Sequence, residues 1–380
     1  MSDRPAPVGS LLRGAAPHHL PEVTAAHLRE TCGADLVEVL LADLTMSALL
    51  PVLDPAGSPG GPLELRCFGS QRPVLDAGPG RPARVLLPLT SWGDRTGVLR
   101  VEFGRPVDGE LTEQLTEIAD ELALALRAAG KDTDRYRRVQ RRQRLTMAAE
   151  LQWDLLPGRS LAGDRFQLAG GLEPAYAMYG DHYDWAVTGE RLTVTVLNGH
   201  GDGIEAALLT TVAVNAMRNA RRSGAGIVEQ AELASDAIYS RYGGLAYVAT
   251  LLLEVDLVAG AVAAVDAGSP RALIAQNGEI RSVNLDQQLP LGMFDDGRYE
   301  IQRFHLEAGD RLLVVSDGVH AAAPGGRPPY GTSALLSALR RTRLQPPTEA
   351  VGTVIRGLRE YHAGLEAEDD AVVVCLDWLR

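Results

Sequence analysis

The chain has 380 residues, of which 46% are hydrophobic and 23% are charged, and its formal net charge is −12 at pH 7. This length predicts two or three domains, and the composition is that of a soluble globular protein with a large core. The acidic balance argues against a general affinity for nucleic acid or for an anionic membrane.

The cysteines and the apolar stretches bear on the compartment. Cys32, Cys67 and Cys375 are far apart and odd in number, and each lies in an apolar or mixed run. This pattern predicts buried thiols in a reduced cytoplasmic protein, and neither a disulfide framework nor a zinc site. The first residues lack the apolar core of a signal peptide, and no stretch approaches eighteen consecutive apolar residues, so no membrane span is expected.

The first third of the chain has the pattern of a small α+β domain. Residues 1–20 are rich in Pro, Gly and Ala, which predicts a flexible arm. A helical pattern over 21–33 is followed by strand-like runs and then by a helix with one apolar face. The expected strands are Asp35–Ala42, Ser47–Leu53, Leu63–Phe68, Arg84–Leu89 and Gly97–Phe103, and the apolar face of the helix carries Leu111, Leu115, Ile118, Leu122 and Leu126.

This order of elements resembles a GAF-type sensor domain over residues 21–128. The resemblance rests on the strand pair that contains LLPL and GVLRVEF, followed by the amphipathic helix. It implies an input of ligand or signal, although no haem, metal or chromophore ligand stands out. We expect Cys32 and Cys67 to be core residues of this domain.

Residues 129–158 are predicted to form a helical linker. A run rich in Lys and Arg over 131–144 leads into apolar residues, and Pro157-Gly158 ends the helix. A solvated connector is the favoured interpretation. The alternative is a helix that transmits a signal or forms a homodimer, because its apolar spacing continues that of the preceding helix.

Strands and helices alternate from about residue 159 to the end. The expected strands are Leu192–Leu197, Ala246–Val255, Ala261–Asp266, Arg271–Gln276, Arg311–Ser316 and Ala371–Leu376. The expected helices are Ile204–Arg222, Gly226–Arg241, Ser333–Arg341 and Thr348–Ala363. The pattern predicts one sandwich of antiparallel-rich sheets and helices over 159–380.

Acidic residues recur at the ends of these strands. Asp181 and Asp184 form an acidic cluster before the strand Leu192–Leu197, Asp317 follows a later strand, and Asp369-Asp370 precede the last one. Carboxylates suit hard divalent cations such as Mg²⁺ and Mn²⁺, and a pair of such ions can activate water for attack on phosphorus.

The glycine-dense turn 198–203 allows a second interpretation, a phosphate-cradling dinucleotide loop. Its glycines are spaced Gly199, Gly201 and Gly203, which differs from the G-x-G-x-x-G pattern. His200 within the turn invites a role as a general acid or base, but a plain turn residue is the favoured interpretation.

Several motifs of the second region occur in the order found in a known family. They are LLP at 155–157, YGDHYD at 179–184, NGHGDGIEAA at 198–207, DAGSP at 266–270, LPLG at 289–292, GDRLLVVSDGV at 309–319, PYG at 329–331 and DDAVVV at 369–374. The region 145–380 resembles the bacterial type 2C, metal-dependent protein serine/threonine phosphatases of the sporulation stage II protein E group.

The resemblance implies an α-β-β-α sandwich that dephosphorylates phosphoserine or phosphothreonine with two Mn²⁺ or Mg²⁺ ions. Asp181, Asn198, Asp317 and Asp369 would be the catalytic and metal-binding positions, and Gly199 would offer its carbonyl to the metal. The implied substrate is a phosphoprotein, often an anti-sigma-factor antagonist in relatives. No nucleic acid or membrane partner is expected.

The chain departs from the family pattern at residue 198. Asn198 stands where the family has an Asp that bridges both metals, so a bridging carboxylate is lost and cation affinity should fall. Tyr179 and Ser269 replace a Gly and a His at less critical positions. Two hypotheses follow: a phosphatase of retained or reduced activity that is regulated by the GAF-like domain, and a catalytically weak or dead pseudophosphatase that binds a partner protein.

Overall fold

The computed structural model of the chain describes residues 7–78, 80–141, 144–174 and 178–380. The chain divides into two compact units, Met1–Arg144 and Leu145–Arg380. Within the described residues, no helix combines the length and the apolar character that crossing a bilayer requires.

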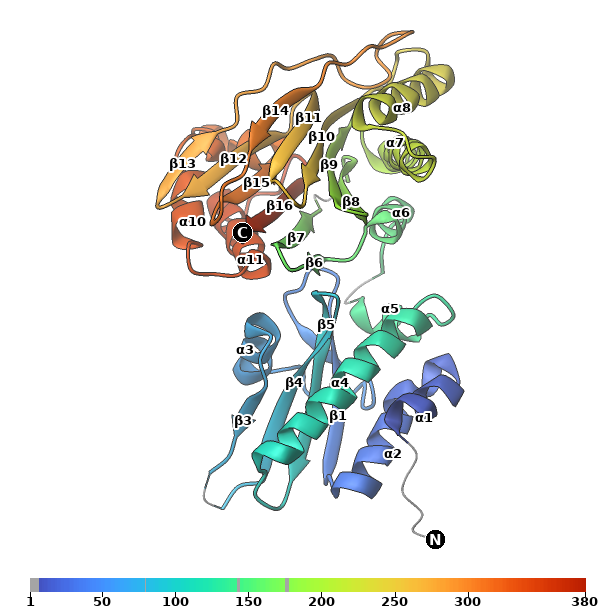
Figure 1. Cartoon of the computed structure of the whole chain (residues 1–380), viewed down its shortest axis with the longest axis vertical. Coiled ribbons are helices and arrows are strands. Elements are labelled where there is room, and N and C mark those ends of the chain that lie inside the picture. The colour runs from blue at the N-terminus through green and yellow to red at the C-terminus, as the bar shows by residue number, and fades with distance from the viewer. Residues whose placement is uncertain (1–6, 79, 142–143, 175–177) are drawn as a thin grey trace. The chain divides into compact units, whose positions relative to one another are not determined.

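The first unit is built on a five-stranded antiparallel sheet of order β2-β1-β5-β4-β3 (Figure 1). Its strands are β1 (Leu36–Ala42), β2 (Leu49–Pro51), β3 (Val74–Asp76), β4 (Ala83–Ser91) and β5 (Asp94–Phe103). Its helices are α1 (Val8–Gly14), η1 (Pro17–His19), α2 (Leu20–Cys32), α3 (Pro62–Ser70), α4 (Gly109–Ala129) and α5 (Arg135–Gln140).

Alternating side chains give this sheet two apolar faces. Residues such as Val39, Leu87 and Leu99 face a core shared with α1, α2 and α4, whereas Leu40, Leu86 and Val98 pack with α3. The amphipathic helix predicted around Leu111–Leu126 is α4, whose apolar residues are buried on the first face.

Two local predictions for this unit were wrong. Within the expected flexible arm, Val8–Gly14 form helix α1, which buries Val8 and Leu12 in the first core; residues 1–6 lie outside the described residues. The expected strand Leu63–Phe68 is part of helix α3. Pro62 lies at the first helical position and the Glu64 side chain accepts a hydrogen bond from Gly61 N, so helix-start signals outweigh a short apolar run.

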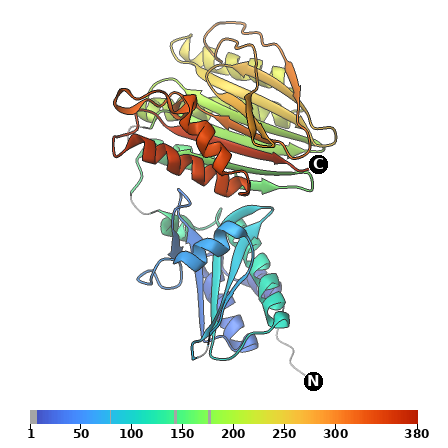
Figure 2. The same cartoon turned by 90° about the vertical axis from the view of Figure 1, so that its left-hand side faces the viewer.

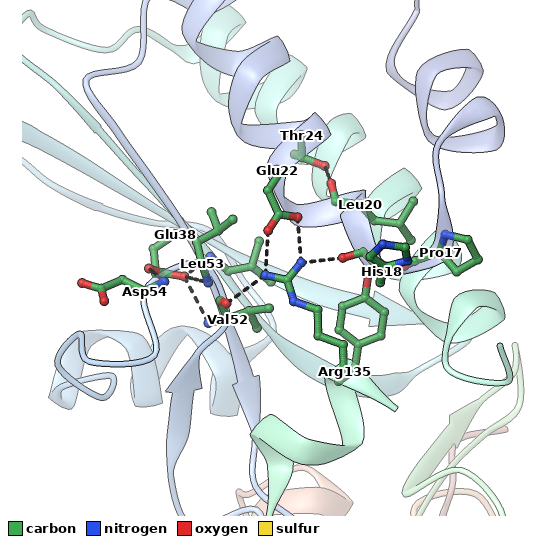
Figure 3. A network of polar contacts seen from close by, with 12 residues as sticks. Pro17, His18, Leu20, Glu22, Thr24, Glu38, Val52, Leu53, Asp54 and Arg135 are labelled. Carbon is green, nitrogen blue, oxygen red and sulfur yellow. Dashed lines mark hydrogen bonds and ion pairs between the residues drawn. The ribbon is translucent and has the colours of Figure 1, made fainter. Parts of the chain in front are cut away.

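A polar network fastens α5 to the rest of the first unit (Figure 3). Arg135 donates hydrogen bonds to the Glu22 carboxylate on α2 and to the carbonyl oxygens of His18 and Val52, and its ion pair with Glu22 spans 2.6 Å. Burial raises the pKa of Glu22, but the hydrogen bond from Arg135, a main-chain hydrogen bond and the nearby positive charges together leave this pKa lowered. Tyr136 adds a hydrogen bond to Pro17 O at 2.5 Å.

The same region contains a buried acid that is satisfied by main chain alone. The Glu38 carboxylate accepts N–H bonds from Val52 and Leu53 at 3.2 and 2.9 Å and from Asp54 at 3.3 Å (Figure 3). These donors follow β2 directly. Glu38 therefore holds in place the same segment whose Val52 carbonyl oxygen accepts a hydrogen bond from Arg135. The six-residue helix α5 is therefore held by tertiary contacts rather than by its own length.

We expect Arg135→Ala to loosen α5 because the variant removes hydrogen bonds from a charged donor. The loss should be about 1–2 kcal/mol for this partly exposed group, which corresponds to a roughly 5- to 30-fold faster amide exchange in α5. Hydrogen exchange of the full chain measures this. The exposed Arg138→Ala is the matched control, and equal protection of α5 in both variants would contradict the assignment.

The predicted linker 129–158 contains two separate short helices in the structure. Helix α5 belongs to the first unit and α6 (Met147–Leu155) to the second. The basic run 131–144 contains α5 and also residues 142–143, which lie outside the described residues. Helix α6 begins at Thr146, whose side chain caps Ala149 N at 3.2 Å, and ends before Pro157. The boundaries of the four predicted segments, including the linker, stay predictions.

The second unit is a sandwich of two antiparallel sheets, with orders β14-β11-β10-β9-β8 and β13-β12-β15-β16-β7-β6 (Figure 1). The first contains β8 (Asp181–Thr188), β9 (Arg191–Gly199), β10 (Val248–Asp256), β11 (Ala261–Ala267) and β14 (Gln302–His305). The second contains β6 (Ser160–Ala162), β7 (Phe166–Glu173), β12 (Arg271–Gln276), β13 (Glu279–Ser282), β15 (Arg311–Val315) and β16 (Ala371–Trp378).

Helices cover the outer faces of both sheets. Helices α7 (Gly203–Arg222) and α8 (Ile227–Tyr242) pack on the first sheet, and α10 (Ala334–Arg341) and α11 (Pro347–His362) pack on the second, as Figure 2 shows for the red pair. Short helical turns α9 (Asp317–His320), η2 (Pro324–Gly326) and η3 (Tyr330–Thr332) follow β15.

The strands of the sandwich are apolar on both sides because one face of each sheet packs against the other sheet and the opposite face packs against helices. Val194 and Val374 lie in the core between the sheets, whereas Leu197 and Val373 lie under the outer helices. The predicted α+β class and the α-β-β-α sandwich of the second region are confirmed. All six predicted strands and all four predicted helices of this region are present within a few residues of their expected bounds.

The three cysteines are buried and free, as predicted. Burial raises the pKa of Cys67 and of Cys375 to about 12 in each case. At pH 8 roughly one such thiol in ten thousand is ionised, and the thiolate is the reactive form.

We therefore expect the native Cys32→Ser variant, which retains Cys67 and Cys375, to react negligibly with a thiol reagent at pH 8. Both thiols should react at once in denaturant. Absorbance after addition of an aromatic disulfide reagent measures this, and rapid reaction of either thiol in the folded protein would show that its burial is wrong.

Candidate functional site

Four strands from the two sheets bring the predicted site residues to one end of the sandwich. Asp181 opens β8 and lies opposite Asn198 near the end of β9, because the two strands are antiparallel. Asp317 follows β15, and Asp369 precedes β16. Strands β15 and β16 are neighbours that run in opposite directions, so the end of one lies beside the start of the other.

The strand period explains why Asp181 and Asn198 face the same space. Tyr183 and Trp185 on β8 and Val194 and Val196 on β9 all lie in the core between the sheets. Asp181 lies two residues before Tyr183, and Asn198 lies two residues after Val196. Because side chains alternate along a strand, Asp181 and Asn198 point to the same side as these core residues, at the end of the sandwich. The core thus ends in polar side chains rather than in apolar ones.

Asp181 is the most constrained acid of the site. It is 0% exposed, and among the residues that the structure describes neither of its carboxylate oxygens has a hydrogen-bond partner. Burial raises its pKa well above the ordinary value, and the neighbouring carboxylates of Asp369 and Asp317 raise it further; the nearby Ser316 hydroxyl opposes this only in part. A buried carboxylate without a partner is costly, so this position calls for a proton or a cation.

Asp369 and Asp317 supply the other charges, and both are partly exposed. Burial and then the Asp317 carboxylate raise the pKa of Asp369 to about 7. Asn198 Nδ2 donates a short hydrogen bond to Asp317 Oδ1. Asp317 and Asp369 also line a pocket of about 300 Å³, together with Glu368 and His362. The pocket gives the acids a route to solvent.

The donor chemistry of these residues fits a hard divalent cation. Carboxylate and carbonyl oxygens are the ligands that Mg²⁺ and Mn²⁺ prefer, and the unpartnered oxygens of Asp181 are free to coordinate. Gly199, the fifth predicted ligand, is buried at the end of β9 beside Asn198. Within the described part of the chain, however, no group of three or more His, Cys, Asp or Glu side chains converges as a ready-made metal cage. The hydrogen bond from Asn198 occupies Oδ1 of Asp317. The Asp317 side chain would therefore have to rotate before that oxygen could bind a cation.

Two residues that were not among the predicted ligands, Asp370 and Gln152, hold the site in place. Asp370 is fully buried, and its Oδ2 accepts hydrogen bonds from Tyr179 N at 2.7 Å and Gly180 N at 3.1 Å, just before Asp181. Gln152 on α6 donates to the same oxygen at 3.3 Å and to Asp181 O at 3.4 Å. The sequence offered one indication for Asp370. It lies two and four residues before Val372 and Val374, which face the core between the sheets, so the strand alternation directs its side chain toward the same side.

The glycine turn is supported from α7. Thr210 Oγ1 donates to Gly180 O at 2.7 Å, and an added Cβ at Gly199 would lie 2.6 Å from that hydroxyl. Gly180 also has a positive φ of 87°, a region that favours glycine. Close approach of the two chain segments therefore requires glycine at both positions.

The predicted acidic cluster Asp181/Asp184 separates into two roles. Asp184 faces the outer side of β8 and forms ion pairs with Arg218 at 2.7 Å and Arg221 at 3.2 Å, both on α7. Its side chain is only 4% exposed, and Arg218 also donates to Leu155 O at 2.7 Å. Asp184 therefore anchors α7 and α6 to the sheet and is not one of the clustered acids.

The dinucleotide-loop interpretation is wrong for this turn. Strand β9 pairs with β8 and β10 in antiparallel fashion, whereas a dinucleotide unit uses parallel strands joined through the helix. His200 is exposed in the turn, and its ring lies 4.6 Å from that of Tyr247. The contact is with an aromatic neighbour and not with the clustered acids.

Gly318 permits close contact between the two acid-bearing segments. A Cβ at this position would lie 1.8 Å from Asp370 O and 3.3 Å from Asp369 Cβ.

We expect Gly318→Ala to displace these segments and to destabilise the unit by about 1–3 kcal/mol or more. Chemical unfolding measures this, and Gly352→Ala on α11, where a Cβ meets no atom within 4 Å, is the control. Equal stabilities would refute the close approach.

The comparisons with known proteins agree with this architecture. The family model described as stage II sporulation protein E (SpoIIE) matches residues 188–379, about half of the chain. A structure of the RsbU and RsbW domains of a Mycobacterium tuberculosis protein is 21% identical, with a TM-score of 0.50 over 59% of this chain and 63% of that chain. No protein with a curated description matches the sequence.

Two further solved structures have the same TM-score of 0.50. The SiaA PP2C domain of Pseudomonas aeruginosa is 20% identical over 56% of this chain and 85% of its own. The PP2C phosphatase domain of Bacillus subtilis SpoIIE, with a fragment of its regulatory domain, is 19% identical over 57% of this chain and 65% of its own. The chain thus spans less than two thirds of the M. tuberculosis and B. subtilis structures.

These likenesses show the fold of the second unit, while the GAF-like assignment of residues 21–128 stays a prediction. Membership of one family accounts both for the predicted α-β-β-α sandwich and for the order of the motifs. The chain belongs to the stage II sporulation protein E (SpoIIE) family, and its second unit has the fold of the solved PP2C domains.

Proposed function

We propose that the chain is a metal-dependent phosphoserine/phosphothreonine phosphatase that acts on a protein in bacterial signalling. The observation that supports this most directly is the gathering of Asp181, Asp317 and Asp369 at one end of the sandwich, with Asp181 buried and unpartnered. The Asp317 and Asp369 carboxylates add to burial in raising the pKa of Asp181, so this site calls for protons or cations. A site that must be neutralised by cations suits a dianionic phosphoryl group.

The chain's own residues would act as follows. Asp181, Asp317 and Asp369, with the carbonyl of Gly199, would hold Mn²⁺ or Mg²⁺, two ions by analogy with the family. When bound, such ions polarise the phosphoryl oxygens and lower the pKa of water. The pocket beside Asp317 and Asp369 would admit the phosphorylated side chain. Asp370 and Gln152 would keep the segment before Asp181 in position.

Asn198 favours the second candidate, a catalytically weak or dead pseudophosphatase that binds a partner protein. Its amide Nδ2 donates a hydrogen bond to Asp317 Oδ1, so it occupies an oxygen that would bind a cation instead of contributing a carboxylate. Removing a negative charge from the site lowers cation affinity. We propose attenuated catalysis rather than complete loss, because the remaining acids are still gathered at the site.

The partner and the regulation are also proposals. One similar solved structure contains RsbU and RsbW domains together, which supports an anti-sigma-factor antagonist as the phosphoprotein substrate. Residues 21–128 would regulate the phosphatase domain as a GAF-like sensor. Assembly as a homodimer through residues 129–158 completes the proposal.

The first experiment measures phosphate release from p-nitrophenyl phosphate in millimolar Mn²⁺. We expect feeble wild-type turnover, a rise of at least tenfold in Asn198→Asp because a bridging carboxylate is restored, and loss of turnover in Asp317→Ala. Asn215→Asp is the matched control, since it makes the same change at an exposed position of α7.

The outcomes separate the two candidates. A silent wild type with an active Asn198→Asp variant would identify a pseudophosphatase that differs from an enzyme by one residue. Turnover that survives Asp317→Ala would refute the metal assignment itself. Isothermal titration with Mn²⁺ alone, in which Asn198→Asp should bind more tightly, tests the site without relying on activity.

A further inference from the structure

A second pocket lies at the opposite end of the second sheet from the clustered acids. It occupies about 240 Å³ and is formed by the β12–β13 hairpin, the end of β16, the start of β15 and helix α10. Figure 1 shows α10 beside this hairpin. Arg311 pairs with Asp377 at this end of β15 and β16, whereas Val315 pairs with Val373 at the other. The length of β15 therefore separates the pocket from Asp317.

The walls of the pocket are apolar and its rim is basic. Ile280, Leu339 and Trp378 contribute apolar surface, and Arg340 and Arg343 line the same cavity. Both arginines are exposed, and within the described residues no ion pair is formed by either of them.

The acidic residues that the structure describes in the pocket do not form ion pairs with Arg340 or Arg343 and so leave their positive charges exposed to solvent. Asp377 forms a bidentate pair with the buried Arg311, at 2.6 and 2.7 Å, which neutralises both groups. Asp310 is only 2% exposed and accepts a hydrogen bond from Glu307 N at 2.9 Å. The solvent-facing charge of the rim is therefore positive.

Arg311 also fixes the loop that carries Arg343. Its guanidinium donates to Thr342 O at 2.7 Å and to Gln345 O at 2.6 Å, on either side of Arg343. A loop held at both ends loses little conformational freedom when it binds a partner. The rim is thus preorganised by a buried ion pair.

Exposed apolar side chains extend the surface beyond the cavity. Leu344, next to Arg343, is 88% exposed, and Leu379, in the pocket wall, is 45% exposed. An apolar pocket with exposed leucines and a charged rim is typical of a protein-binding surface. A ligand confined to 240 Å³ would leave Leu344 uncovered, which favours an extended partner.

We propose that this surface, defined by Ile280, Leu339, Arg340, Arg343, Leu344 and Leu379, docks an acidic protein segment that inserts an apolar side chain into the pocket. Carboxylates of the segment pair with Arg340 and Arg343, and the apolar side chain packs against Ile280 and Leu339. Charge complementarity selects the partner and the pocket sets its register. The surface is independent of whether the metal site turns over.

The test uses the full chain and a fluorescein-labelled peptide of Asp and Glu residues with one central Leu, followed by fluorescence anisotropy. We expect the wild type to bind this peptide, and binding to weaken at least tenfold in Arg340→Glu/Arg343→Glu and for a peptide with Ser in place of Leu. Binding should also weaken as salt is added. Arg222→Glu, which reverses the charge of an exposed arginine on α7, should bind as the wild type does.

Three outcomes would overturn the proposal. They are no binding by the wild type, equal binding by the double variant, and equal binding of the Leu and Ser peptides. Co-sedimentation with phosphatidylglycerol vesicles in the absence of peptide binding would assign the surface to a lipid instead. Thermal unfolding of each variant shows whether the fold is intact, which the exposure of both arginines leads us to expect.

Discussion

Mutual repulsion among carboxylates at one end of the sandwich is the constraint on which the second unit depends. Antiparallel pairing within each sheet brings Asp181 beside Asn198, and the neighbouring ends of β15 and β16 bring Asp317 and Asp369 to the same place. Such a cluster costs free energy unless it is neutralised. The surrounding contacts, from Asp370 to the main chain before Asp181 and from Thr210 to Gly180, hold the segments together against it.

Asn198 changes this balance in a definite direction. In place of a further negative charge, it supplies an N–H donor to Asp317 and so relieves part of the repulsion in the protein without metal. The relief stabilises the metal-free state at the expense of the metal-bound state. A residue that departs from the motif can in this way favour folding at the expense of cation binding, which is a common exchange at functional sites.

The sequence predicted the second unit better than the first, for physical reasons. Strands such as Arg271–Gln276 are continuous apolar runs between clear turns, and the ordered motifs identified the sandwich. In the first unit, the run Leu63–Phe68 was too short to separate strand from helix by period alone. The site acids Asp181, Asp317 and Asp369 were predicted as a group. The separate role of Asp184 could not be predicted, because it depends on Arg218, which lies 34 residues further along the chain.

Helix α6 gives the acid cluster a mechanical link to the segment that enters the unit. A single side chain, Gln152, connects this helix to both Asp370 and the main chain of Asp181. A shift of α6 by the length of one hydrogen bond would therefore alter the spacing of the acids without any change in the sheets. The acid-bearing end of the sandwich is in this way connected, through one side chain, to the first helix of the unit.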